Sequence, residues 1–160
     1  MNKVYKNIFI PCIILTILTI MFGCSNNRIN AEHETKKMAE QIIECLNNNN
    51  SKELKSMFSK YSTDSYDLDN QIKELFDFFD GEIVSYDDFD SGTGQETISK
   101  GKTTLLTISP IIKNVVTDTG KVFEIRFFAY LACEDDENEV GISSIIISSS
   151  DGDECIVGIW

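Results

Sequence analysis

The apolar residues of this chain change their spacing at Gly81, and this change limits the folds that the chain can adopt. Before Gly81 they recur every three or four residues, which is the spacing of one helix face. After Gly81 they recur at every second residue, as in a strand with one buried face. A chain of 160 residues is long enough for one domain. Helices followed by strands predict the α+β class, with the helices packed on a curved, mostly antiparallel sheet.

Three helices are predicted before Gly81. They cover approximately residues 36–46, 50–58 and 67–79, with a polar break at 61–66. Asn50 and Glu53 have the spacing of a capping box, so the second helix begins there. Gly81 is a favourable residue just past the end of the third helix.

Five strands are predicted after Gly81. They are Glu82–Phe89, Thr103–Thr117 with an interruption at Pro110, Lys121–Cys133, Val140–Ser149 and Glu154–Trp160. Residues 90–95 and the acidic stretch 134–139 are predicted loops. Thr119-Gly120 and Asp151-Gly152 have the composition of tight hairpin turns.

The strand at 121–133 has the clearest alternation in the chain. One of its faces is entirely apolar and is predicted to lie against the helices: Phe123, Ile125, Phe127, Ala129, Leu131 and Cys133. The opposite face is mixed and contains Glu124, Arg126, Phe128 and Tyr130. Aromatic residues and arginine are enriched at protein interfaces, so these four residues form a candidate contact surface. The simpler interpretation is an ordinary surface ion pair between Glu124 and Arg126.

The amino terminus has the order of a secretory signal. Lys3 and Lys6 precede an apolar run from Ile8 to Phe22, which is too short for a typical membrane-spanning helix. The run ends at residues 21–24, Met-Phe-Gly-Cys, which resemble the lipobox of bacterial lipoproteins. The resemblance implies cleavage between Gly23 and Cys24 and attachment of palmitate-type acyl chains to Cys24. The alternative is an uncleaved signal anchor.

This resemblance predicts three parts of the chain: a signal peptide at 1–23, a lipidated cysteine and tether at 24–34, and a domain at 35–160. The domain is expected on the extracytoplasmic face of the cell membrane. His33, the single histidine, lies in the predicted tether and is expected to be solvated.

Charge narrows the set of partners. Lys3 and Lys6 are two of the 14 basic residues, so the mature chain carries 12 basic against 26 acidic residues, a net charge of −14. Nucleic acid is excluded as a partner, because binding it requires neutralisation of phosphates. Electrostatic docking on anionic lipid is disfavoured for the same reason. Membrane attachment is therefore expected through the lipid at Cys24.

Cysteine usage gives no metal or redox motif. Cys12 belongs to the predicted signal and Cys24 to the lipobox, which leaves Cys45, Cys133 and Cys155. Three cysteines allow at most one disulfide, and small buried apolar cysteines are the favoured interpretation.

The domain resembles the NTF2-like cone, in which amino-terminal helices pack into a bent sheet. More specifically, it resembles a family of domains of unknown function found on bacterial lipoproteins. The resembling stretches are LKSMFSK (54–60), LDNQIKELFDFFDGEI (68–83) and DDENEVGISSIIIS (135–148). The resemblance implies no established activity, cofactor or catalytic residue. It does imply a tendency toward sheet-to-sheet dimers, so a homodimer or an envelope protein partner is expected.

Two site hypotheses remain open. In NTF2-like enzymes a pocket lies between the helices and the sheet, where Tyr86 and Trp160, with Tyr61 and Tyr66 near the mouth, would bind an apolar small molecule. The favoured alternative is that these aromatic residues fill the core or its rim. Asp88–Gly92 has oxygen ligands at alternate positions, but the glutamate of a calcium loop is out of register, so no metal site is predicted. The function predicted from the sequence is thus a membrane-tethered binding module, with a small pocket enzyme as the alternative.

Overall fold

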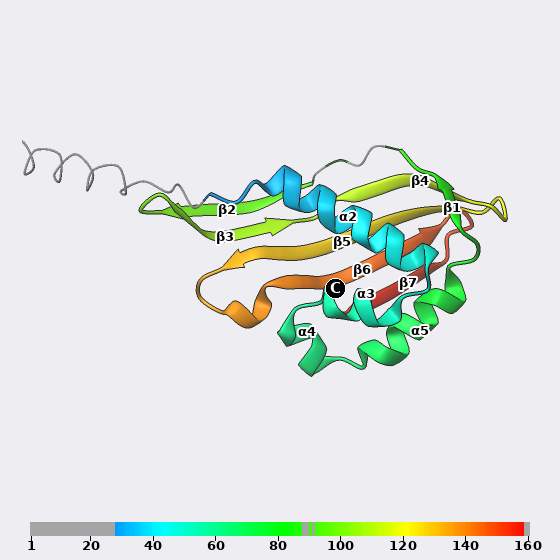
Figure 1. Cartoon of the computed structure of the whole chain (residues 1–160), viewed down its shortest axis with the longest axis horizontal. Coiled ribbons are helices and arrows are strands. Elements are labelled where there is room, and N and C mark those ends of the chain that lie inside the picture. Colours follow the sequence, from blue (N-terminus) through cyan, green and yellow to red (C-terminus); the bar gives the residue numbers. More distant parts are fainter. Residues whose placement is uncertain (1–27, 88–89, 91, 159–160) are drawn as a thin grey trace, which may run out of the picture.

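The computed structural model describes residues 28–87, 90 and 92–158, which form four helices and one antiparallel sheet of seven strands (Figure 1). The helices are α2 (Ala31–Asn47), α3 (Ser51–Ser56), α4 (Lys60–Ser65) and α5 (Leu68–Phe78). The strands are β1 (Ile83–Ser85), β2 (Thr93–Ser99), β3 (Lys102–Ile108), β4 (Ile111–Thr117), β5 (Val122–Cys133), β6 (Gly141–Ser149) and β7 (Glu154–Gly158). A short 3-10 helix, η1 (Glu137–Glu139), precedes β6. The α+β class is confirmed.

The long strand β5 is the centre of the sheet. Along one side it pairs with β6, and β7 pairs with the outer side of β6. Along its other side β5 pairs first with β4 and then with β3. β1 lies outside β4, and β2 lies outside β3. The predicted interruption at Pro110 is the point at which β3 ends and β4 begins, since proline cannot donate a backbone hydrogen bond.

The core lies between the helices and one face of this sheet. Figure 1 shows α2 crossing the sheet in front of β5, with α5 beside β7. Ile42 of α2, Leu75 of α5 and Phe127 of β5 are each no more than 1% exposed and belong to one apolar cluster. The predicted inner face of β5 is confirmed as far as Ala129. Beyond Tyr130 the pairing with β3 shifts register, which interrupts the alternation and leaves Leu131 and Cys133 half-buried.

The first helix begins earlier than predicted, at Ala31, inside the stretch that was interpreted as tether. The side chain of Asn30 caps it by accepting a hydrogen bond from the backbone N–H of His33 (3.2 Å). Glu32 and Glu34 lie in the first turn, where their negative charges interact favourably with the positive end of the helix dipole. His33 is exposed there, as expected.

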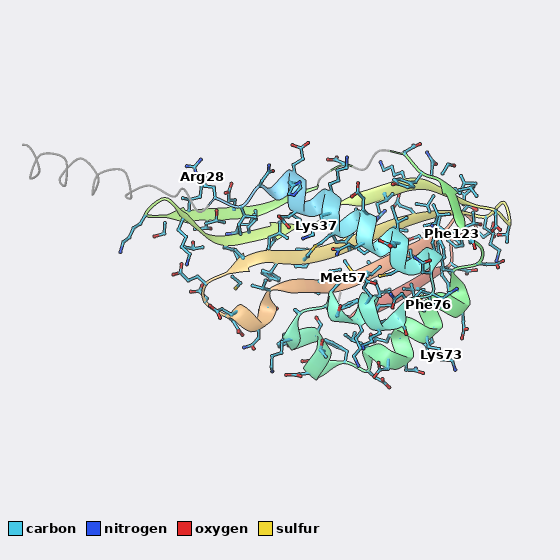
Figure 2. All side chains as sticks on the ribbon, viewed as in Figure 1. Arg28, Lys37, Met57, Lys73, Phe76 and Phe123 are labelled. Carbon is cyan, nitrogen blue, oxygen red and sulfur yellow. The ribbon has the colours of Figure 1, made fainter. Side chains whose placement is uncertain are left out.

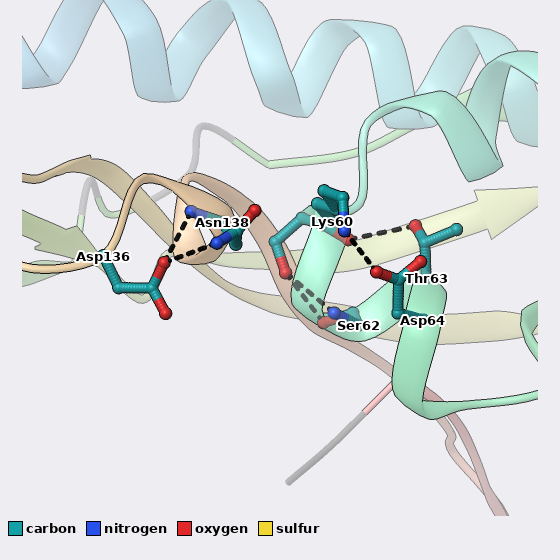
Figure 3. A network of polar contacts seen from close by, with 7 residues as sticks. Lys60, Ser62, Thr63, Asp64, Asp136 and Asn138 are labelled. Atoms are coloured by element: carbon teal, nitrogen blue, oxygen red, sulfur yellow. Dashed lines mark hydrogen bonds and ion pairs between the residues drawn. The ribbon is translucent and has the colours of Figure 1, made fainter.

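The prediction of three helices is wrong, because the polar break at 61–66 is itself largely helix α4 (Figure 3). Ser59 caps α4 by accepting a hydrogen bond from the backbone N–H of Ser62 (3.1 Å), and both serines are fully buried. A helix of six residues that buries a serine has no apolar stripe for a sequence pattern to detect. At its exposed side Lys60 pairs with Asp64, and the hydrogen bond to that carboxylate raises the pKa of Lys60.

Backbone hydrogen bonds join the α3–α4 connection to the start of β6. The N–H of Ile142 donates to the carbonyl of Met57, and the N–H of Ser59 donates to the carbonyl of Ile142, each at 2.9 Å. Gly141, with a φ of +125°, allows this approach: a Cβ there would lie 2.8 Å from the nitrogen of Ser59. The two short helices are therefore fixed to the sheet through their connecting backbone.

Strand β2 was not predicted, and the loop assigned to 90–95 extends into it. Its described side chains are almost all exposed, because β2 is an edge strand that pairs only with β3. The pairing contains two register shifts, between Thr93 and Glu96 and between Thr97 and Ile98. The predicted first strand at 82–89 is shorter than expected, since β1 ends at Ser85.

Across residues 28–158, apart from the gaps at 88–89 and 91, no helix has the length and apolar character needed to cross a membrane.

Candidate functional site

The predicted contact surface lies on the face of β5 that the described helices leave uncovered. Glu124, Arg126, Phe128 and Tyr130 alternate with the buried residues of the same strand and are half-buried or exposed. The structure therefore brings together the four residues that sequence alternation had selected.

An ion pair occupies one end of this surface. The Nε of Arg126 donates to Oε1 of Glu124 at 2.7 Å, and Nη2 lies 2.5 Å from the same oxygen. The arginine side chain is 46% exposed, so solvent screens the pair and its contribution to stability is small. A partner could therefore take over either charge at low energetic cost.

Two aromatic rings occupy the other end. The ring centroids of Phe128 and Tyr130 are 5.4 Å apart, and their planes make an angle of 85°. This edge-to-face geometry holds each ring in one orientation. Rigid, half-buried aromatic side chains lose little conformational entropy when a partner covers them.

An apolar row that the sequence analysis missed extends the surface across neighbouring strands. Arg126 is paired with Ile111 of β4 on one side and with Ile146 of β6 on the other. Ile146 in turn pairs with Ile156 of β7, whose side chain is 42% exposed. Ile146 is buried by its neighbours but does not belong to the core cluster. The run of three isoleucines at 145–147 was the available signal, because it makes both faces of β6 apolar.

A separate groove of about 700 Å³ opens at the end of the sheet where the described chain begins. Its walls come from the stretch before α2, the start of β3, the end of β5 and η1. Figure 2 shows Arg28 at this end, beside β2 and β3. The charged residues of the lining are Arg28, Lys102, Glu134 and Glu137. This groove could not be predicted from the sequence, because its walls come from segments that are far apart in the chain.

The Thr103 side chain lines this groove and is only 4% exposed. Its hydroxyl oxygen is buried and has no hydrogen-bond partner among the described residues. A buried hydroxyl without a partner costs free energy, so a polar ligand or water that reaches it would be favoured.

Two of the four aromatic residues of the predicted pocket are exposed, and a third packs at the edge of the core. Tyr86 and Tyr61 are 42% and 43% exposed, and Tyr66 packs against the core. Trp160 lies outside the described residues. The groove described above and two smaller cavities are lined by other residues.

Acidic residues near η1 form local turns. Oδ1 of Asp136 accepts hydrogen bonds from the backbone N–H of Asn138 (2.9 Å) and from its side-chain amide (2.8 Å), as Figure 3 shows beside α4. Among the residues that the structure describes, no three His, Cys, Asp or Glu side chains are grouped to hold a metal ion. Most of the calcium-like stretch at 88–92 lies outside the described residues.

The three cysteines of the described chain are free thiols. Cys45 is buried on α2, and burial raises its pKa from 9.0 to about 11, with the carboxylates of Glu53 and Glu44 adding to the shift. Burial also raises the pKa of Cys155, and Glu74 adds to that shift. A raised pKa keeps both thiols protonated and poorly nucleophilic at neutral pH. Cys12 and Cys24 lie outside the described residues.

Comparison with known proteins gives one family. A family model with the description "Domain of unknown function (DUF5104)" matches residues 41–150, which is more than half of the chain. No curated protein shows significant similarity to the chain.

Proposed function

We propose that this chain, which belongs to the DUF5104 family of domains of unknown function, is a lipid-anchored binding module that contacts its partner through the uncovered face of its sheet. One observation carries the proposal. On β5 the inner face is buried as far as Ala129, while on the outer face Arg126 is exposed and Phe128 and Tyr130 are only half-buried. Monomeric proteins seldom leave such a patch without a use.

The composition of the surface supports a protein partner. Two aromatic rings and an arginine lie beside a row of isoleucines, and these residue types are enriched in the cores of interfaces. The ion pair between Glu124 and Arg126 lies next to the rings and adds charge that a partner could complement.

A second copy of the chain is the first candidate partner, and a different envelope protein is the second. Opposite charges two residues apart on one strand make the surface self-complementary, because a two-fold axis would bring Glu124 of one copy to Arg126 of the other. Each mature chain carries −14, but this repulsion is screened beyond about 8 Å at physiological salt. The helices on one side of an antiparallel sheet also support the NTF2-like cone, in which such dimers form.

The anchor is proposed from the sequence of the amino terminus. A basic start, an apolar run and Met-Phe-Gly-Cys at 21–24 support export, cleavage before Cys24 and acylation of its thiol. The Cys24→Ala variant should lose acyl labelling and accumulate as uncleaved precursor, because no other residue at that site supplies a thiol. Metabolic labelling with a fatty-acid analogue measures this, and unchanged labelling of the variant would disprove the anchor.

The contact surface is tested on the full acylated chain in detergent micelles by sedimentation equilibrium. We expect a dimer for the wild type, weakened about tenfold or more by Tyr130→Ala or Arg126→Glu, which is the usual effect of losing a central interface residue. Tyr61→Ala makes the same substitution on α4, Lys73→Glu makes the same change in charge on α5, and both should leave the dimer intact.

A wild-type monomer at all concentrations would remove the second copy as partner. Photo-crosslinking from position 128 in intact cells then tests for an envelope protein, with position 61 as the control. If crosslinking from position 128 gave no more product than crosslinking from position 61, the proposed contact surface would be wrong.

A further inference from the structure

We infer that the groove at the start of the described chain binds the headgroup of a zwitterionic phospholipid of the phosphatidylethanolamine type. The inference rests on the proposed lipid anchor at Cys24 and concerns a different surface from the outer face of β5.

The groove is held close to the acylated residue by the length of the chain. Arg28, which lines the groove, follows Cys24 by four residues. Four residues span at most about 14 Å when fully extended. Because α2 begins at Ala31, no long tether separates this end of the domain from the membrane. The groove must therefore stay within reach of lipid headgroups.

The charges of the groove match a ligand that carries both signs. Its lining contains two cationic residues, Arg28 and Lys102, and two acidic residues, Glu134 and Glu137. This balance contrasts with the net charge of −12 on the whole chain. A phosphate would bind the cations and a primary ammonium would bind the carboxylates, whereas a purely anionic headgroup would leave Glu134 and Glu137 unpaired.

A weak ion pair leaves these charges accessible. Nζ of Lys102 lies 3.9 Å from Oε1 of Glu134, and the two side chains are 60% and 56% exposed. At that distance the pair is loose and contributes little to stability. A zwitterion can replace it by giving Lys102 a phosphate oxygen and Glu134 an ammonium donor.

The remaining lining fits the part of a phospholipid nearest its headgroup. Ile29 is half-buried in the wall, and Val140 is 42% exposed beside it, so both provide apolar contacts for the glycerol and the first methylene groups. The volume of about 700 Å³ is in the usual range for small-ligand sites.

The site needs only a low affinity. A short tether gives a binding module an effective ligand concentration in the millimolar range. A site with millimolar affinity would then be about half occupied, and half occupancy slows local hydrogen exchange about twofold.

The test uses the full acylated chain in nanodiscs made of phosphatidylcholine alone or with added phosphatidylethanolamine or phosphatidylglycerol. Hydrogen exchange is followed by mass spectrometry at residues 99–104 and 131–140. We expect exchange about twofold slower in both segments when phosphatidylethanolamine is present. Phosphatidylcholine should give no protection, because its trimethylammonium group has no N–H to donate to Glu134.

A matched pair of variants separates the groove from overall charge. Arg28→Glu with Lys102→Glu should abolish the protection, whereas Lys37→Glu with Lys73→Glu makes the same change in net charge on α2 and α5 and should retain it. Inserting twenty Gly and Ser residues between Asn27 and Arg28 should reduce the protection by lowering the effective concentration.

Each of the remaining outcomes contradicts one part of the proposal. If the wild-type chain is not acylated and does not enter the nanodiscs, the anchor is wrong. If it enters them but exchange is the same in all three lipids, the groove proposal alone is wrong. Equal protection by phosphatidylglycerol would show that the site needs no ammonium donor, and the zwitterion specificity would be rejected.

Discussion

Phe127 is the largest of the fully buried side chains, and it lies in the middle of β5 with 1% of its surface exposed. Phe127→Ala should lower the free energy of unfolding by about 3–5 kcal/mol, because it removes a buried ring and leaves a cavity. Lys121→Ala, directly before the same strand, removes an exposed pair with Asp80 at 3.1 Å and should cost less than about 1 kcal/mol. Urea unfolding of both variants checks this, and equally small losses would show that the inner face is assigned wrongly.

Cys45 should make the stability of the domain sensitive to alkaline pH. Burial raises its pKa to about 11 from 9.0, so the folded state holds the thiol proton more tightly than the unfolded state does. The resulting stabilisation is fully present below pH 9 and is lost as the pH rises through 11. Two pKa units correspond to about 2.7 kcal/mol, most of which is lost by pH 11.

The measurement compares urea unfolding of the wild type and Cys45→Ala at pH 8 and pH 11. The difference in unfolding free energy between the two proteins should shrink by about 2 kcal/mol at the higher pH, while effects of other titrating groups cancel. A difference that stays the same at both pH values would contradict the assignment.

Sequence alone selected the outer-face residues of β5 that form the proposed contact surface, but not their neighbours. Alternation within one strand is a property of the local sequence, so Arg126, Phe128 and Tyr130 could be selected together. That Ile146 and Ile156 continue the surface depends on the register of β6 and β7, which the alternation pattern does not encode. The same holds for the groove, whose walls come from four separated segments.

At the scale of secondary-structure elements, the close approach of β6 to the α3–α4 connection depends on Gly141. Gly141→Ala would place a Cβ 2.8 Å from the nitrogen of Ser59 and 2.9 Å from its Cα, both backbone atoms that cannot move independently. We expect a loss of about 3 kcal/mol from strain and overpacking together.

Gly120→Ala is the matched control, because Gly120 also has a positive φ (+81°) but has no atom within 4 Å of an added Cβ. Gly120→Ala should lower the free energy of unfolding only by the cost of backbone strain, about 1 kcal/mol. Thermal unfolding of both variants measures the difference. Equal losses would mean that β6 and the α3–α4 connection do not pack as described.

Elements were predicted well where burial produces a periodic pattern, as in α5 and β5, and poorly where it does not. Helix α4 buries a serine, and β2 buries little at the sheet edge, so neither has an apolar period. The start of α2 was placed too late because its first turn, Ala31 to Glu34, is held by a cap and by charge rather than by an apolar stripe.

At the scale of the whole molecule, the α+β class followed from the order of the two periodicities. The family model matches residues 41–150, which lie within the domain predicted at 35–160. Function did not follow to the same degree, because a fold can carry many functions and specificity resides in surfaces assembled from distant segments.

The register shifts of β2 have a consequence for molecules kept at high density. A straight, regular edge strand is a template on which another chain can add its own strand, and repeated addition leads to fibres. The two irregularities between Thr93 and Ile98 displace the backbone groups of β2 from the even spacing that such a template needs. Copies crowded side by side can thus meet through their side chains without their backbones merging into a continuous sheet.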